Sequence, residues 1–324
     1  MKRFLVGLAA LALGIGGQAH AQPNATAKVA LVLPGPITDG TFNAAANAGI
    51  KAAEKKYKIK VSIQENTASA QIESALTSFA RDGYDIVIGH GFQFAEPAMK
   101  VHKRFPKTWF IVNTAKVAAA PNLASFDNRW GDAGYVAGAV AALASKTGTI
   151  GHIGGIPVPV IQEYNEGFER GAKRMRPDIK VLSAYVGSFS DVAKGKEVTL
   201  SLIERGADVV TSTGNENVMG TIQAAKEKNV MAIGSAFDAA ALAPDTIVTT
   251  AIVRMDVNID MAVGLVLSKK IEAKNYLLGF KEDGLGLAPF YKFEDKISAE
   301  DKAKIRQLVE DIKAGRVADL PKIR

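Results

Sequence analysis

The sequence predicts an α/β protein built as two lobes, each a doubly wound parallel sheet. Short apolar runs alternate with amphipathic helical stretches almost from end to end. The apolar runs are near-continuous Val, Ile and Ala, as in strands that are covered on both faces. This pattern restarts after Phe126, and 324 residues exceed the ~100–150 of one typical domain. Two successive sets of similar size therefore predict two similar lobes.

The first set of elements runs from residue 28 to residue 113. Its strands are expected at Lys28–Pro34, Lys60–Glu65, Asp85–Gly89 and Trp109–Asn113. Its helices are expected at Phe42–Tyr57, Ala70–Asp82 and Glu96–Phe105. Because strands and helices alternate, right-handed crossovers would join them into a parallel sheet.

The second set begins with a helix at Gly131–Ser145. Its strands are expected at Thr149–Ile153, Lys180–Tyr185, Asp208–Ser212, Met231–Gly234 and Ile247–Ile252. Its later helices are expected at Ile161–Met175, Val192–Arg205, Val218–Lys228 and Val257–Lys270. A last helix, Ala299–Gly315, has Ser298 as its N-cap and acidic residues in its first turn.

These sets suggest how the chain divides between the lobes. The chain is expected to cross near Ala124–Arg129 and to return near Ile252–Met255. We therefore expect residues 26–125 plus about 254–280 in the first lobe and residues 126–253 in the second. The sequence does not assign residues 281–324 to either lobe.

Residues 1–21 have the features of a secretory signal peptide. Lys2 and Arg3 precede an apolar run, Phe4–Gly17, and Gln18–Ala21 carries the small-x-small pattern of a cleavage site. The run is shorter than the ~20 residues that a bilayer span needs. We expect cleavage after Ala21 and a periplasmic protein. Because the sequence has no cysteine, a lipoprotein is not expected.

Charge and composition argue against nucleic acid as a partner. The 40 basic and 33 acidic residues give a net charge of +7, which falls to +5 without Lys2 and Arg3. The lysines are scattered over helices, whereas a nucleic-acid groove interleaves basic and aromatic residues.

Catalytic patterns are also missing from the sequence. His90, His102 and His152 lack the spacing of metal ligands. No G-x-S-x-G serine occurs, and the glycines of residues 148–155 do not follow the dinucleotide-binding order. We therefore expect no enzyme activity, no metal and no cofactor.

The residues that follow the predicted strands are the candidate ligand contacts, because ligands of open α/β sheets bind beyond the carboxyl ends of the strands. Aromatic and amide side chains recur at these positions in both halves, which favours a flat ligand with polar edges. The candidate ligand-binding residues are Phe42, Asn43, Phe92, Asn113, Phe189, Gly214, Asp238 and Arg254.

At these positions the chain resembles the basic membrane protein family of ABC-transporter substrate-binding proteins, whose studied members often bind purine nucleosides. The matching stretches include Asp39–Asn43, Gly89–Phe92, Phe110–Asn113, Asp132–Tyr135, Glu166–Phe168, Gly187–Phe189, Gly206–Asp208 and Ile252–Asp256. They follow the family order over nearly the whole chain after residue 21.

The resemblance implies a type I periplasmic-binding fold, with two lobes that are joined by three hinge strands and close on the ligand. It implies that Phe42 and Phe189 sandwich a purine ring, and that Asn43 and Asn113 meet the edge of the base. Positions 214, 238 and 254 would line the sugar end. A membrane permease is the implied partner, and we expect a monomer.

Three departures from the family pattern bear on the ligand. Asn113 stands where the family commonly has aspartate, and an amide suits the donor and acceptor edge of adenine. Arg254 replaces the usual lysine. Ser235–Asp238 replaces Val-Asp-x-Asp, so one acidic residue that would grip ribose is missing. A free nucleobase is therefore an alternative to a nucleoside.

Two other interpretations stay open. A binding protein of the same fold that takes a sugar would also use aromatic residues, but would gather more charged side chains around the hydroxyls. A periplasmic nucleoside hydrolase would need an acidic metal cluster or an activated nucleophile.

Overall fold

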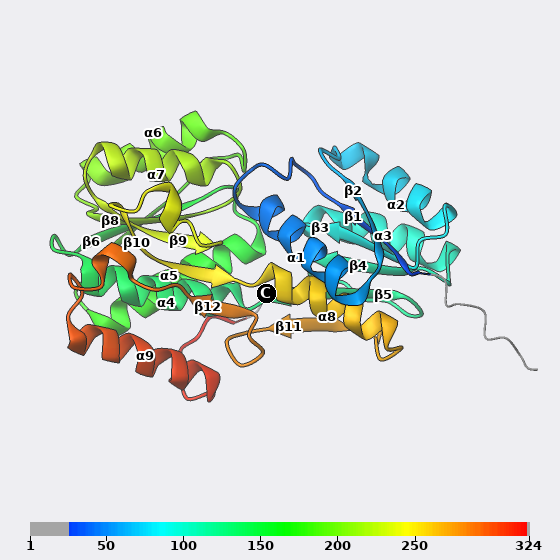
Figure 1. Ribbon diagram of the computed structural model, residues 1–324. Coiled ribbons are helices and arrows are strands. Elements are labelled where there is room, and N and C mark those ends of the chain that lie inside the picture. Colours follow the sequence, from blue (N-terminus) through cyan, green and yellow to red (C-terminus); the bar gives the residue numbers. More distant parts are fainter. Residues whose placement is uncertain (1–25, 323–324) are drawn as a thin grey trace, which may run out of the picture.

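The computed structural model describes residues 26–322, so the predicted signal peptide lies outside the described residues. Two six-stranded sheets lie side by side, each with helices on both faces (Figure 1). Every strand pairs in parallel except the short β12. The predicted two-lobed, doubly wound α/β architecture is confirmed.

The first sheet has the order β11-β5-β4-β3-β1-β2. Its strands are β1 (Lys28–Val32), β2 (Lys60–Gln64), β3 (Ile86–His90), β4 (Trp109–Asn113), β5 (Leu123–Asn128) and β11 (Asn275–Leu278). Its helices are α1 (Phe42–Tyr57), α2 (Ile72–Arg81), α3 (Ala95–Val101) and α8 (Met255–Leu267), with short 3₁₀ turns η1 (Ser69–Gln71), η2 (Phe92–Phe94) and η3 (His102–Arg104). Alternate β1 side chains point to opposite faces, where α1 and α8 cover one and α2 and α3 the other.

The second sheet has the order β12-β10-β9-β8-β6-β7. Its strands are β6 (Thr149–Gly154), β7 (Lys180–Tyr185), β8 (Val209–Thr213), β9 (Met231–Ala236), β10 (Ile247–Val253) and β12 (Leu285–Leu287). Its helices are α4 (Trp130–Ala144), α5 (Pro159–Met175), α6 (Val192–Glu204), α7 (Asn217–Glu227) and α9 (Ala299–Lys313), with 3₁₀ turns η4 (Ala240–Leu242) and η5 (Tyr291–Phe293). The predicted Ser298 cap of α9 is confirmed, because its hydroxyl accepts from the Asp301 amide at 3.0 Å.

The chain passes between the two sheets three times. The first crossing, at Arg129, joins β5 to α4, and the second, at Arg254, joins β10 to α8. The third joins β11 to β12 through residues 279–284. After it, α9 packs on α4, so the C-terminal segment lies with the second lobe.

Helices α4 and α5 touch through glycines. A Cβ on Gly134 would lie 2.1 Å from the Tyr164 carbonyl oxygen, and one on Gly138 would lie 1.9 Å from that of Phe168. In return, a Cβ on Gly171 would meet the backbone of α4 at 1.9 Å. Only glycine, which has no side chain, permits this close approach of the two helices.

Among residues 26–322, no helix has the length and apolar character of a bilayer span.

Candidate functional site

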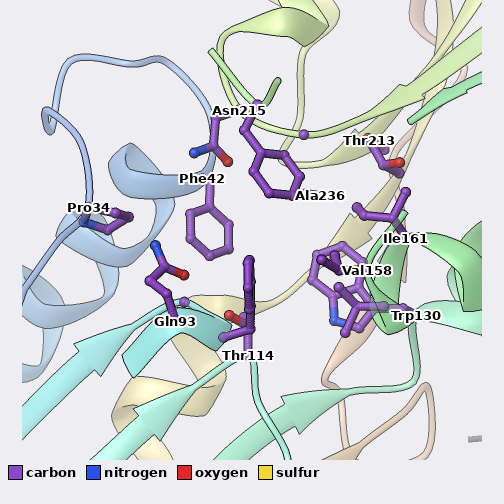
Figure 2. Close-up of a pocket in the computed structure, with 16 residues that line it drawn as sticks. Pro34, Phe42, Gln93, Thr114, Trp130, Val158, Ile161, Thr213, Asn215 and Ala236 are labelled. Carbon is purple, nitrogen blue, oxygen red and sulfur yellow. The ribbon is translucent and has the colours of Figure 1, made fainter. Parts of the chain in front are cut away.

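A pocket lies between the two lobes (Figure 2). The first lobe contributes Pro34, Phe42, Gly91, Phe92, Gln93 and Thr114. The second lobe contributes Trp130, Val158, Val160, Ile161, Phe189, Thr213, Gly214, Asn215, Ser235 and Ala236. The carboxyl ends of β4, β8 and β9 reach this pocket, as the rule for open α/β sheets predicts.

Phe42 forms the aromatic wall on the first lobe. It begins α1, and its ring stacks on the His90 imidazole with centroids 3.8 Å apart and planes at 25°. The Nε2 atom of His90 lies 3.0 Å from the Phe42 carbonyl oxygen. Because a carbonyl only accepts, His90 carries its proton on Nε2. His90 therefore supports both the ring and the backbone of Phe42.

Asp39 fixes the start of α1. Its carboxylate accepts from the backbone amides of Thr41, Asn43 and Ala44, each at 2.9 Å. These are amides of the helix N-terminus that have no partner within the helix. Asp39 therefore caps α1 and fixes the position of Phe42 at the pocket.

Phe189 forms the opposing wall on the second lobe. It lies in the loop between β7 and α6, and its ring rests on Gly155, where a Cβ would approach a ring carbon to 2.3 Å. Its ring centroid is 6.3 Å from that of Phe92, with the planes tilted by 58°. Aromatic side chains of the two lobes therefore meet across the pocket.

Trp130 completes the apolar lining at the first crossing. Its indole nitrogen donates to Asp127 at 3.0 Å, and its side chain is almost fully buried. Burial raises the pKa of Asp127 to about 6, because the charged carboxylate is poorly solvated there. Trp130 thus serves both the pocket and the packing of the crossing.

The pocket is neutral. Among the described residues that line it, none has a charged side chain, and the polar groups are Gln93, Thr114, Thr213, Asn215 and Ser235. Figure 2 shows the amides of Gln93 and Asn215 on either side of the Phe42 ring. Amides and hydroxyls both donate and accept, so the site suits an uncharged ligand with polar edges.

Two lining residues hold a strained backbone. Thr114 and Ala236 have φ values of 68° and 67°, in the left-handed region that disfavours residues with a side chain. Such strain is found preferentially at ligand sites, where the surrounding structure maintains it. Each residue follows or ends a strand, so the strain turns the chain at the edge of the pocket.

Four of the eight predicted ligand contacts line the pocket: Phe42, Phe92, Phe189 and Gly214. Asn43 and Asn113 do not. Asn43 is buried and donates its side-chain amide to Asp39 at 2.8 Å. The amide nitrogen of Asn113 is 3.0 Å from Nδ1 of His90. Both side chains turn inward because they find partners inside the first lobe.

Asp238 and Arg254 also lie off the pocket wall. Asp238 is exposed and accepts from the Tyr291 hydroxyl. Arg254 binds Asp256 on α8 with its Nε and Nη2 atoms, at 2.9 and 2.8 Å. Each charged group therefore has a partner outside the pocket, and neither side chain lines the pocket.

The eight candidates leave out several lining residues. Thr213 ends β8 and Asn215 comes two residues later, so both lie where the strand-end rule places ligand contacts. Gln93 had no comparable signal. Its side chain folds over Gly91, where a Cβ would lie 2.4 Å from the amide oxygen of Gln93.

An ion pair also joins the lobes. Lys116, in the loop after β4, lies 2.7 Å from Glu163 on α5, whose side chain is 2% exposed. Like the contact between Phe92 and Phe189, this ion pair joins a residue of the first lobe to a residue of the second.

Among residues 26–322, no cluster of three or more His, Asp or Glu side chains forms a metal site.

The chain is similar in sequence and in fold to known substrate-binding proteins. The sequence model of the Bmp family, described as ABC transporter substrate-binding protein PnrA-like, matches residues 26–318. A purine-binding protein of Brucella abortus is 29% identical over 298 residues, which cover 90% of this chain and 84% of that protein. The nucleoside-binding protein BmpA of an ABC transporter in Lactococcus lactis is 31% identical over 69% of this chain and 67% of its own. A solute-binding protein of Aeropyrum pernix shares the fold, with a TM-score of 0.82, 23% identity and coverage of 89% and 92%.

Proposed function

The chain belongs to the Bmp family of PnrA-like ABC transporter substrate-binding proteins. We propose that it binds a neutral purine between its lobes and delivers this purine to an ABC permease. One observation carries this proposal. Phe42 from the first lobe and Phe189 from the second both line a pocket whose polar groups are all uncharged. Stacking on aromatic faces with amides at the edge is the recognition that a flat heterocycle requires.

The pocket favours a free nucleobase over a nucleoside. Ribose hydroxyls are commonly held by carboxylates, and no carboxylate is among the described residues that line the pocket. The one predicted acid for the sugar end, Asp238, is engaged by Tyr291. A sugar attached to the base would therefore add few favourable contacts.

The neutral edge also favours adenine over guanine. Guanine presents adjacent N1–H and N2–H donors, which suit an ionised carboxylate. Adenine presents the N6 donor beside a ring-nitrogen acceptor, which one amide such as Gln93 or Asn215 can satisfy. We therefore propose that Gln93 and Asn215, instead of Asn113, form the hydrogen bonds to the edge of the base.

Binding would proceed by closure of the lobes. Because each lobe supplies one wall, the ligand makes contacts in the closed form that the open form lacks, and this difference shifts the population. Two stacking contacts and several edge hydrogen bonds are consistent with a Kd around micromolar, about −8 kcal/mol.

The test has two parts. Mass spectrometry of small molecules released by denaturing freshly purified protein would identify a ligand that is carried through purification. Calorimetry with adenine, adenosine, guanine, hypoxanthine and D-ribose would then rank the affinities. We expect adenine to bind more tightly than guanine and at least as tightly as adenosine. Tighter binding of guanine would remove the adenine preference, and tightest binding of D-ribose would favour a sugar-binding protein.

We propose no catalytic role. A nucleoside hydrolase would cleave adenosine to adenine and ribose, so chromatography after long incubation with adenosine separates the two classes. Only intact adenosine is expected. Periplasmic location, a signal peptide cleaved after Ala21 and a monomeric state are further parts of the proposal, and the mass of the exported protein and its elution volume test them.

A further inference from the structure

A line of buried hydrogen bonds runs from the pocket wall into the first lobe. The Phe42 carbonyl accepts from Nε2 of His90 at 3.0 Å, and Nδ1 of His90 lies 3.0 Å from Nδ2 of Asn113. Oδ1 of Asn113 accepts from Nδ2 of Asn258 on α8 at 2.9 Å. His90 and Asn258 are fully buried and Asn113 is 1% exposed. We call these three residues the relay.

The relay ends where the chain crosses between the lobes. Asn258 also donates to Oδ1 of Asn128 at 2.7 Å, and Asn128 donates to the Gly284 carbonyl at 2.8 Å. Asn128 ends β5 at the first crossing, Asn258 lies in the first turn of α8 after the second, and Gly284 belongs to the third. Hydrogen bonds of these two asparagines thus connect all three crossing segments.

The hydrogen bonds of the relay have only one consistent direction. The Phe42 carbonyl requires the proton of His90 on Nε2, so Nδ1 is a lone pair that accepts from the Asn113 amide nitrogen. This fixes the orientation of the Asn113 amide and turns its oxygen toward Asn258. Burial lowers the pKa of His90 to about 4, so the imidazole stays neutral at pH 7. Each donor in the relay faces an acceptor, so replacing one donor by an acceptor should disrupt the whole relay.

We infer that Asn258 is a positioning residue that acts through Asn113 and His90, so that the placement of the Phe42 wall and the approach of the two lobes are coupled. None of the relay residues lines the pocket. The inference rests on the proposed function only in that a ligand stacks on Phe42. It also gives Asn113 a definite task, which is to connect His90 to Asn258 by donating to Nδ1 of His90 and accepting from Nδ2 of Asn258.

The test exchanges one atom in the relay. Asn258→Asp keeps the shape of the side chain but sets an acceptor against the oxygens of Asn113 and Asn128. The matched control is Asn122→Asp. Asn122 is 2% exposed and precedes β5, at the end of that strand away from the first crossing, and its amide donates to the backbone carbonyls of His102, Phe105 and Thr108.

Both variants are compared with the wild type by two measurements. Calorimetry gives the affinity for adenine. Spin labels give the distance between the lobes, because the chain has no cysteine and exposed Ala48 on α1 and Ser201 on α6 can each be replaced by one. Double electron–electron resonance is recorded with and without adenine.

Asn258→Asp is expected to bind adenine about tenfold more weakly or worse, equivalent to about 1.4 kcal/mol, with a broader distance distribution at saturation. Asn122→Asp is expected to stay within about twofold of the wild type, with an unchanged distribution. Wild-type binding and closure in Asn258→Asp would overturn the inference, and so would equal losses in the control.

Two further results keep the inference testable. If the wild-type protein binds no purine, the proposed function fails. The relay still predicts a broader distance distribution between the lobes of ligand-free Asn258→Asp than in the wild type. An unchanged distribution would overturn the inference. If Asn258→Asp does not fold, Asn113→Asp replaces it. A carboxylate facing Nδ1 would raise the pKa of His90 above the value of about 4 that burial gives it in the wild type. A wild-type His90 titration in that variant, followed by NMR of the imidazole, would overturn the inference.

Discussion

Phe189→Ala removes the second-lobe wall of the pocket with little effect on the fold. The ring is partly exposed, lies in a loop and rests on Gly155 and near Phe92 instead of in a core cluster. A base stacked on an aromatic side chain loses about 1–3 kcal/mol when that side chain becomes alanine. At 1.4 kcal/mol for each factor of ten, the Kd should rise about 5- to 150-fold.

Calorimetry with adenine at 25 °C measures this change, and Trp130 fluorescence gives an independent reading because its ring lines the same pocket. Phe79→Ala is the matched control. Phe79 is also partly exposed and pairs edge-on with Tyr84 at 5.0 Å, but it lies on α2 outside the pocket. The control should lose stability without losing affinity.

Phe42→Ala removes the other wall and should weaken binding by a similar factor. Its thermal stability needs a separate check, because the ring also stacks on buried His90. If both wall variants bound adenine as tightly as the control, the purine would not lie between these rings, and the stacking argument would be refuted.

Three further predictions concern stability. Gly138→Ala should lower Tm by about 5 °C or more, because its Cβ would lie 1.9 Å from the Phe168 carbonyl, whereas Gly286→Ala, with its nearest atom at 3.8 Å, should change little in calorimetric scans. The pKa of Asp127 is raised to about 6 from its ordinary 3.8. The folded state therefore holds this proton more tightly, and the free energy of unfolding should fall by about 2 kcal/mol as the pH rises from 4 to 6. Urea titrations of Asp127→Asn should lack this fall, and a profile parallel to the wild type would contradict it. Burial lowers the pKa of His152 to about 3. As the pH falls below 6.5, this histidine is therefore protonated in the unfolded chain but stays neutral in the folded state. Stability should then decline by as much as about 5 kcal/mol toward pH 3, and His152→Gln should decline less in the same titrations.

The fold could be predicted because its strands and helices carry local signals. Buried strands such as β3 and β4 are continuous apolar runs, and helices such as α2 have a clear apolar face. The short edge strands β11 and β12 were not predicted. With four and three residues, they have no pattern of their own and form only because β5 and β10 offer a free edge.

The site could be predicted only in part, because the strand-end rule does not say which way a side chain points. His90 and Asn113 are register partners on β3 and β4, and both turn beneath α1 and α8. Thr114, one residue later, turns into the pocket through its left-handed backbone. Side chains alternate between the two faces of a strand, and this alternation decides which residue lies at the pocket. A single polar residue at a strand end does not show which face its side chain is on.

The two walls of the pocket are supported by different means, and this bears on how the lobes move. On the first lobe, the relay and the Asp39 cap support Phe42 through polar groups. On the second lobe, the Phe189 ring rests on Gly155. Each ring is supported within its own lobe, so we expect the movement on binding to occur mainly at the three crossings. Closure should then carry each wall as a rigid unit, and the affinity for a flat ring should depend on how closely the crossings let the walls approach.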